Sequence, residues 1–230
     1  MIGKSIANRP YMYLPLKGDT NDYSTNAQNP SNTGVTTTTG QFGESNGAYE
    51  WGADIDVLSW SSSVGNSIAE KLNLNSTILW FIYLNNTNYS LARVHISQYA
   101  SSSQSAFNNL YRSDGSYTRA YRPTNWDNGQ VSDFTINNVI TDDTWEMHSI
   151  RTNKLDATNV EYFFNDGSNK NTKSDMALMK EDATAEFNIG ERADNTRSFI
   201  GKMHTFRIYD VTLSDGALKI LNNEKGRIRA

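Results

Sequence analysis

The sequence predicts an all-β protein, a sandwich or barrel of many short strands with one short helix near its C-terminus. Short runs of β-branched and aromatic residues recur along the 230-residue chain, and turn residues separate them. Asn, Ser and Thr make up 72 of the 230 residues, yet only 20% of the residues are charged and 11% are aromatic. That balance is not typical of disordered chains. The length suits a single domain that spans residues 1–230.

Strands are expected where apolar residues alternate with polar ones or form a short continuous run. Ser76–Leu84 is nearly all apolar, which indicates a central strand covered on both faces. In Ser90–Ser97, Ile96 would face one side of a sheet and His95 the other. The other expected strands are Tyr11–Leu16, Val35–Thr39, Ala48–Trp51, Ile55–Ser59, Ala106–Arg112, Tyr117–Arg122, Thr144–Thr152, Val160–Asn165, Ala185–Gly190 and Phe199–Tyr209.

The segments between these runs are mostly turns. Lys17–Gly34 is a long polar stretch that cannot bury a core, and Asp114-Gly115 suits a tight hairpin turn. Near the end, Ser214 is a good helix N-cap, and Asp215 places negative charge at the positive end of the helix dipole. We therefore expect one short C-terminal helix after Leu213.

Several functional classes are disfavoured by composition. The chain has no cysteine, a formal charge of −4 and a pI near 5.4, which argues against a disulfide scaffold and a basic nucleic-acid groove. Three scattered histidines (His95, His148 and His204) without cysteine do not indicate zinc. The longest apolar run is far too short to span a membrane, and the first ten residues lack the apolar core of a signal peptide.

A series of short motifs carries a family resemblance. The C-terminal third, and less clearly the first quarter, resembles the concanavalin A-like lectin/glucanase superfamily in its laminin-G-like form. The resemblance implies a jelly-roll β-sandwich of two antiparallel sheets. The motifs are Leu14-Pro15-Leu16, Gly47-Ala48-Tyr49-Glu50-Trp51, Trp145-Glu146-Met147-His148, Tyr162-Phe163-Phe164-Asn165-Asp166-Gly167, Ile189-Gly190, Phe199-Ile200-Gly201, Phe206-Arg207-Ile208-Tyr209 and Leu213-Ser214.

Two positions depart from the family pattern. An acidic residue that often helps to bind calcium commonly stands three positions after the Gly of Phe-x-Gly, but here that position is His204. His148 occupies a place usually taken by a small aliphatic residue. The resemblance alone does not assign a function, because this sandwich hosts lectins, glycoside hydrolases and structural modules.

Catalysis is not expected. The Glu-x-Asp-x-x-Glu strand that the family's glycosidases carry does not occur. Asp54 and Asp56 have the spacing of a carboxylate pair, but they follow Gly52 in a short edge strand or loop. The segment 65–69 only loosely approximates a serine nucleophile elbow.

A loop with three polar side chains is a calcium candidate. Asp19, Asn21 and Asp22 cluster in the polar stretch, and oxygen ligands from a flexible loop suit calcium. The alternative is that these side chains bond their own backbone, as Asx residues in loops usually do.

The preferred ligand candidate is the hairpin around Asp114-Gly115 and the loop that follows it. Pairing Ser113 with Ser116 would place Leu110 and several Arg and Tyr side chains on one face. Aromatic rings stack on sugars, whereas Arg, Asn and Asp bond to hydroxyls. A protein interface and a purely structural role remain alternatives. The candidate residues are Arg112, Tyr117, Arg119, Tyr121, Asn125, Trp126 and Asp127.

These observations favour a non-catalytic, lectin-like binding or structural module. We expect it on the surface of a phage or viral virion, assembled in the host cytoplasm, as a capsid decoration, head fibre or tail adhesin. Its partner would be a glycan or another virion protein, and not nucleic acid or membrane. The alternatives are an extracellular carbohydrate-binding module of a secreted polysaccharide-degrading system, and a divergent glycoside hydrolase.

Overall fold

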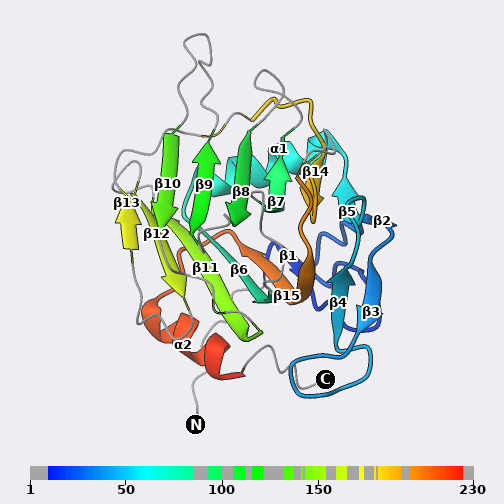
Figure 1. The fold of residues 1–230 in the computed structure, drawn as a ribbon. Helices are drawn as coiled ribbons and strands as arrows, with labels where there is room; N and C mark the ends of the chain where they lie inside the picture. The colour runs from blue at the N-terminus through cyan, green and yellow to red at the C-terminus, as the bar shows by residue number, and fades with distance from the viewer. Residues whose placement is uncertain are drawn as a thin grey trace.

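The protein forms a sandwich of two antiparallel β-sheets, as the sequence predicts (Figure 1). The computed structural model describes residues 10–84, 93–99, 106–111, 116–121, 132–136, 141, 143–153, 159–164, 171–173, 179, 181–192 and 197–224. No helix in these ranges is long and apolar enough to cross a membrane.

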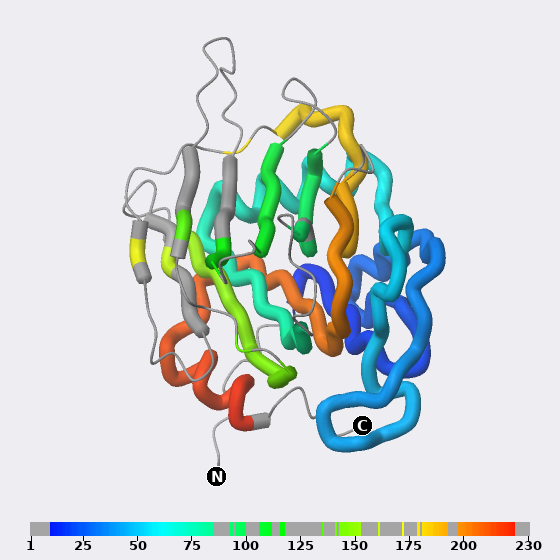
Figure 2. Tube along the Cα trace, in the orientation of Figure 1, coloured from blue at the N-terminus to red at the C-terminus, as the bar shows by residue number. Residues whose placement is uncertain are grey.

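The first sheet has eight strands, with β6 near its middle. Every residue of β6 except the last is buried, so the expectation of a strand covered on both faces is confirmed. In Figure 2 the blue segment, which begins at the first described residues, runs beside β15, and β1 pairs with that strand. In spatial order the strands are β13 (Asn171–Lys173), β12 (Asn159–Phe164), β11 (Trp145–Asn153), β6 (Ser76–Tyr83), β15 (Gly201–Tyr209), β4 (Ala48–Trp51) and β3 (Thr36–Thr38), with β1 (Met12–Leu14) beside β15.

The second sheet has seven strands and faces the first. One of them, β2, lies inside the polar stretch that we expected to be a loop, and it adds an exposed edge beside β5. In spatial order they are β10 (Ser132–Ile136), β9 (Tyr117–Tyr121), β8 (Phe107–Tyr111), β7 (Arg93–Gln98), β14 (Phe187–Ile189), β5 (Val57–Trp60) and β2 (Ser31–Thr33).

Two helices accompany the sheets. The expected C-terminal helix is α2 (Asp215–Glu224), and the Ser214 hydroxyl accepts the N–H of Ala217 at 3.2 Å as a helix cap. Helix α1 (Ser62–Leu72) was not expected from the sequence, and it lies behind the seven-stranded sheet in Figure 1. Its buried residues recur at helical spacing: Gly65, Ile68, Ala69 and Leu72.

The hydrophobic core has two parts. The larger part fills the space between the sheets and includes Trp51, Trp80 and Phe206. The smaller part lies on the outer side of the eight-stranded sheet, where Leu218 of α2 packs against Leu79 and neighbouring residues. Helix α2 therefore covers part of a sheet face that would otherwise be exposed.

The expected alternation in β7 is interrupted at His95. A β-bulge shifts the register between Val94 and Ile96, and both His95 and Ile96 are fully buried. The His95 ring lies 5.0 Å from that of Trp80 between the sheets. The prediction that His95 and Ile96 face opposite sides was therefore wrong, because periodicity alone does not show where a bulge lies.

Candidate functional site

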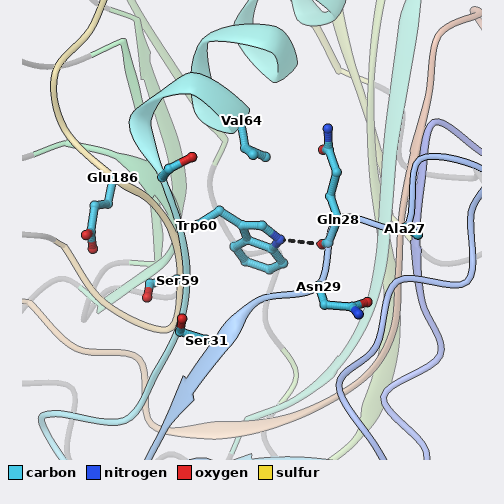
Figure 3. A pocket seen from close by; sticks show the side chains of 9 residues that line it. Ala27, Gln28, Asn29, Ser31, Ser59, Trp60, Val64 and Glu186 are labelled. Carbon is cyan, nitrogen blue, oxygen red and sulfur yellow. Dashed lines mark hydrogen bonds between the residues drawn. The ribbon is translucent and has the colours of Figure 1, made fainter.

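A polar pocket of about 450 Å³ lies at the edge of the seven-stranded sheet, beside β2, β5 and the start of α1. Small-molecule sites commonly have volumes in this range. Figure 3 shows Trp60 at its centre, with Gln28 and Glu186 on opposite sides of the indole in that view. The lining residues are Ala27, Gln28, Asn29, Ser31, Ser59, Trp60, Ser61, Val64 and Glu186.

One wall of the pocket is held in place by Asp22. The Asp22 carboxylate accepts the N–H of Gln28 at 2.9 Å, and the Asp22 N–H donates to Oδ1 of Asn29 at 2.8 Å. The indole N–H of Trp60 donates to the Gln28 carbonyl oxygen at 2.6 Å. These bonds fix the loop before β2 against β5, although the sequence of that loop shows no apolar pattern.

The floor of the pocket is apolar. Trp60 is only 5% exposed, and its ring packs on Phe187 with centroids 5.1 Å apart. Val64 adds an aliphatic side chain from the first turn of α1. The indole is therefore a fixed surface at the base of the site.

Several polar groups of the pocket have no bonding partner within the described part of the chain. Oε1 of Gln28 is buried and accepts no hydrogen bond there. Leaving such an acceptor unsatisfied costs about 1–3 kcal/mol, but this oxygen has no exposed surface and is not itself presented to a ligand. Ser31 and Ser59 lie opposite each other across β2 and β5, and Glu186 is the only charged residue among the described residues that line the pocket. These groups suit a neutral ligand with many hydroxyls.

The loop predicted to bind calcium is held together by its own hydrogen bonds. The Asp22 carboxylate accepts three backbone N–H groups and the Ser24 hydroxyl. The Asp19 carboxylate accepts the N–H of Asn21 and the hydroxyl of Tyr23. Among the residues that the structure describes, no group of three or more His, Asp or Glu side chains could hold a metal. This is the backbone bonding that the sequence left as the alternative.

The β8–β9 hairpin forms as predicted, but its register differs by one residue. Tyr111 pairs with Tyr117, and the pairing continues regularly along both strands. Pairing Ser113 with Ser116 would instead have set residue 112 opposite Tyr117. The expected face that joined Leu110 to Arg119 is therefore wrong, because Arg119 pairs with Asn109.

Tyr117 is not available to a ligand at the surface. It is fully buried, and its ring lies 5.4 Å from that of Tyr111 and 6.2 Å from that of Trp80. Tyr117 is therefore a core residue, which is the purely structural role named as an alternative to ligand binding. Arg119 and Tyr121 also belong to β9, and only their backbone is described. The remaining candidates lie outside the described residues: Arg112, Asn125, Trp126 and Asp127.

Asp54 and Asp56 do not form a catalytic pair. Asp56 is buried, and its Oδ2 accepts the N–H groups of Gly52 and Ala53 at 2.7 and 2.9 Å. Asp54 is exposed and pairs with Arg93 at 3.3 Å. The Asp56 carboxylate thus closes a turn, whereas Asp54 lies at the surface. Neither residue lines the Trp60 pocket.

A second polar and aromatic surface lies on the outer side of the eight-stranded sheet. Trp145, Tyr83 and Lys202 occupy one row across β11, β6 and β15. The rings of Trp145 and Tyr83 lie 5.6 Å apart at 52°, and the Lys202 ammonium lies 5.5 Å from the Tyr83 ring centre. His204 is next to this row, with its ring 4.8 Å from that of Trp145. These four residues are called the outer aromatic face below.

His204 is a neutral part of this face. It is buried and stacks on Phe81 with ring centroids 4.8 Å apart. Burial, together with the positive charges of Arg207 and Lys17, lowers the pKa of His204 to about 3. Its ring nitrogens face the side chains of Thr205 and Gln41. The residue that replaces the family's acidic position thus carries no charge near neutral pH.

Sequence reasoning did not identify either surface. Trp60 lies one residue beyond the expected strand Ile55–Ser59, and Gln28 lies in the stretch interpreted as a plain loop. Trp145 was considered only as the first residue of one of the motifs that carry the family resemblance. The available signal was alternation: Leu58 and Trp60 are two apart in β5 and are both buried.

Sequence comparison supports the family assignment. A family model described as the concanavalin A-like lectin/glucanases superfamily matches residues 63–219. This range covers more than half of the chain. No curated protein shows a significant sequence match.

Several solved structures that resemble this chain are described as binding domains. The receptor-binding domain of a botulinum neurotoxin C/D mosaic serotype has a TM-score of 0.68 at 12% identity, covering 94% of this chain and 51% of its own. The binding domain of botulinum neurotoxin DC, solved in complex with SialylT, has a TM-score of 0.68 at 14% identity, covering 94% and 52%. This chain spans about half the length of these neurotoxin domains.

A smaller structure matches along nearly all of its own length. It is the CBM40 of a Ruminococcus gnavus IT-sialidase, bound to α2,3 sialyllactose. The TM-score is 0.57 at 14% identity, covering 76% of this chain and 96% of the CBM40. At such identities the likeness establishes the fold alone.

Proposed function

Because this chain belongs to the concanavalin A-like lectin/glucanase superfamily, we propose that it is a non-catalytic, lectin-like module that binds a saccharide in the Trp60 pocket. The observation that carries this proposal is the pocket itself, where a carboxylate and serine hydroxyls surround an apolar floor. The fold likeness to binding domains, one of them bound to sialyllactose, supports the same functional class.

The pocket groups match the two sides of a sugar. Trp60 and Val64 provide an apolar base for C–H groups. The Glu186 carboxylate accepts hydrogen bonds from hydroxyls, while Ser31 and Ser59 both donate and accept. Glu186 would repel an anionic group, so the proposed ligand is a neutral saccharide.

The absence of a second carboxylate favours binding over hydrolysis. Glycosidases place two carboxyl groups on either side of the scissile bond, at about 5–10 Å from each other. Among the described residues, Glu186 supplies the one carboxylate that lines this pocket, and the Asp56 carboxylate already accepts two backbone N–H groups. Glycan binding is therefore expected without turnover.

A glycan array followed by calorimetric titration tests the proposal. The wild-type protein should bind at least one neutral oligosaccharide, and Glu186→Ala should weaken that binding about five- to tenfold through the loss of a hydrogen bond to a charged acceptor. Ser59→Phe, which fills the pocket from β5, should abolish binding. Glu70→Ala is the matched control, because Glu70 is an exposed glutamate of α1 outside the pocket.

Two results would refute the proposal. If no neutral glycan binds, the saccharide function fails. If a glycan binds but Glu186→Ala and Ser59→Phe leave its affinity unchanged, the site lies elsewhere. Release of reducing sugar from the bound glycan would contradict the non-catalytic assignment.

We further infer that the module is displayed on a phage or viral virion, as a capsid decoration, head fibre or tail adhesin, after assembly in the host cytoplasm. The lack of cysteine suits folding in a reducing compartment. Uncharged polar loops rich in Asn, Ser and Thr suit an exposed binding surface. Virion proteins would then be partners in addition to the glycan.

The genomic setting and the native particle test this assignment. Neighbouring capsid or tail genes, and antibody labelling of intact virions, are expected. If the native protein is instead secreted together with polysaccharide-degrading enzymes, the virion assignment is wrong and the carbohydrate-binding module is the correct setting.

A further inference from the structure

The outer aromatic face has the features of a second ligand site. Trp145 and Tyr83 are both partly exposed, and their tilted rings form a shallow apolar angle on the sheet. The Trp145 indole N–H makes no hydrogen bond to any described residue and is not buried. A stacking surface beside an unused donor is typical of a saccharide subsite.

The charges around this face are unusual for an acidic chain. Lys202 has no carboxylate within 4 Å among the described residues, and neither has Lys17, whose charge acts on His204. Elsewhere, the cations Arg93 and Arg151 each pair with a carboxylate. Lys202 is partly exposed, and its ammonium group, without a counter-ion among the described residues, can pair with an anionic ligand.

Two carboxylates lie near the face without neutralising Lys202. Glu50 is its cross-strand neighbour on β4, but the two side chains form no ion pair. Asp143 accepts the Tyr83 hydroxyl at 3.0 Å. Burial and this carboxylate raise the pKa of Tyr83, so the phenol stays protonated as the donor.

We propose that the outer aromatic face binds a saccharide that carries a carboxylate, with a sugar ring stacked on Trp145 and the carboxylate paired with Lys202. This site differs from the Trp60 pocket in both place and charge. The pocket contains a carboxylate and no cation, whereas the face presents a cation that lacks a counter-ion. The inference extends the proposed saccharide-binding function, but it does not depend on the pocket.

Titration with matched sugars tests this site. The probes are 3′-sialyllactose and trigalacturonic acid, which carry carboxylates, and lactose as the neutral counterpart. Both acidic probes should bind more tightly than lactose, by up to about fivefold, as an ion pair at a partly exposed site provides. Lys202→Gln should remove that difference, and raising the salt from 50 to 500 mM should reduce it.

Lys71→Gln is the matched control. Lys71 also lies over a tyrosine ring, at 5.9 Å from the ring centre of Tyr11, but it stands beside Glu70 on α1. Its loss should leave binding of the acidic probes unchanged. Glu186→Ala should also leave it unchanged, which separates this site from the Trp60 pocket.

The proposal is overturned by any of three results. The first is that the acidic probes bind no better than lactose. The second is that Lys202→Gln binds them as tightly as the wild type does. The third is that Lys71→Gln weakens the binding of these probes as much as Lys202→Gln does. Loss of acidic-probe binding in Glu186→Ala alone would assign that binding to the pocket instead.

Discussion

The hydroxyl oxygen of Tyr111 lies 2.9 Å from Nδ1 of His148 and joins the two sheets across the buried core. The indole N–H of Trp80 donates to the same oxygen at 3.1 Å, which leaves the Tyr111 proton for His148. Nε2 of His148 then carries the ring proton and faces the Glu146 carboxylate at 3.3 Å. This tautomer is assigned from the bonding pattern.

Tyr111→Phe should lower the free energy of unfolding by about 1–3 kcal/mol, because the Trp80 donor and the Nδ1 acceptor lose their shared partner in the core. Urea unfolding followed by fluorescence measures the change. The control is Tyr23→Phe, which removes an exposed hydroxyl bonded to Asp19 and should cost under about 0.5 kcal/mol. Equal effects in the two variants would mean that Tyr111 is not part of a buried network.

Acid should destabilise the protein before its carboxylates titrate. Burial lowers the pKa of His148 in spite of the nearby Glu146 carboxylate, and burial with nearby cations lowers that of His204 to about 3. Both histidines are therefore neutral in the folded state, whereas in the unfolded chain they take up a proton near pH 6.5. The stabilisation that comes from keeping these histidines neutral is therefore fully present above pH 6.5. Below that pH the free energy of unfolding falls by up to about 1.4 kcal/mol per pH unit for each histidine.

His204→Gln tests this pH dependence. Glutamine keeps a polar side chain toward Gln41 and Thr205 but cannot take up the proton. Unfolding free energies measured between pH 5 and pH 7 should show an average slope smaller by about 1 kcal/mol per unit in this variant. A slope identical to that of the wild type would contradict a neutral, buried His204.

The fold was predictable from sequence where local pattern and tertiary structure agree. The run Ser76–Leu84 and the segment Ala48–Trp51 became β6 and β4 nearly residue for residue. Ser31–Thr33 was missed, because its three polar, exposed residues form a strand only through pairing with β5. Helix α1 was missed although its buried stripe is visible at helical spacing, because the segment 65–69 was compared only with a serine nucleophile elbow.

The candidate site was less predictable, because it depends on long-range contacts. The wall at Gln28 is fixed by a bond to Trp60, 32 residues away, and no local pattern records that contact. The hairpin candidate depended on register, and a shift of one residue changed which side chains share a face. Tyr117 consequently moved from the expected binding surface into the core.

The two helical glycines should respond oppositely to alanine. A Cβ at Gly65 of α1 would lie 2.5 Å from Nε2 of Gln98, a group held by hydrogen bonds to three acceptors. A Cβ at Gly216 of α2 would meet only Ser214 Oγ, at 3.9 Å. Gly65→Ala should therefore destabilise by about 1–3 kcal/mol, and Gly216→Ala should stabilise by about 0.5–1 kcal/mol.

Thermal and urea unfolding of both glycine variants measure these shifts. Each variant serves as the control for the other, because each adds one methyl group to a helix of similar length. Stabilisation by Gly65→Ala equal to that by Gly216→Ala would show that α1 does not pack closely against Gln98.

Stability should not depend on calcium, because the loop around Asp22 already satisfies its own carboxylates. Asp22→Asn keeps the size of the side chain but replaces one acceptor oxygen by an N–H₂ group, which cannot accept bonds from the Ser24 hydroxyl and the Gln28 N–H if it replaces Oδ2. The variant should lose about 1–3 kcal/mol of unfolding free energy. Urea unfolding of wild type and variant, each in 5 mM CaCl₂ and in 5 mM EDTA, should give the same loss in both buffers. A midpoint for the wild type that rises in calcium, with no rise in the variant, would instead establish a calcium site at Asp22.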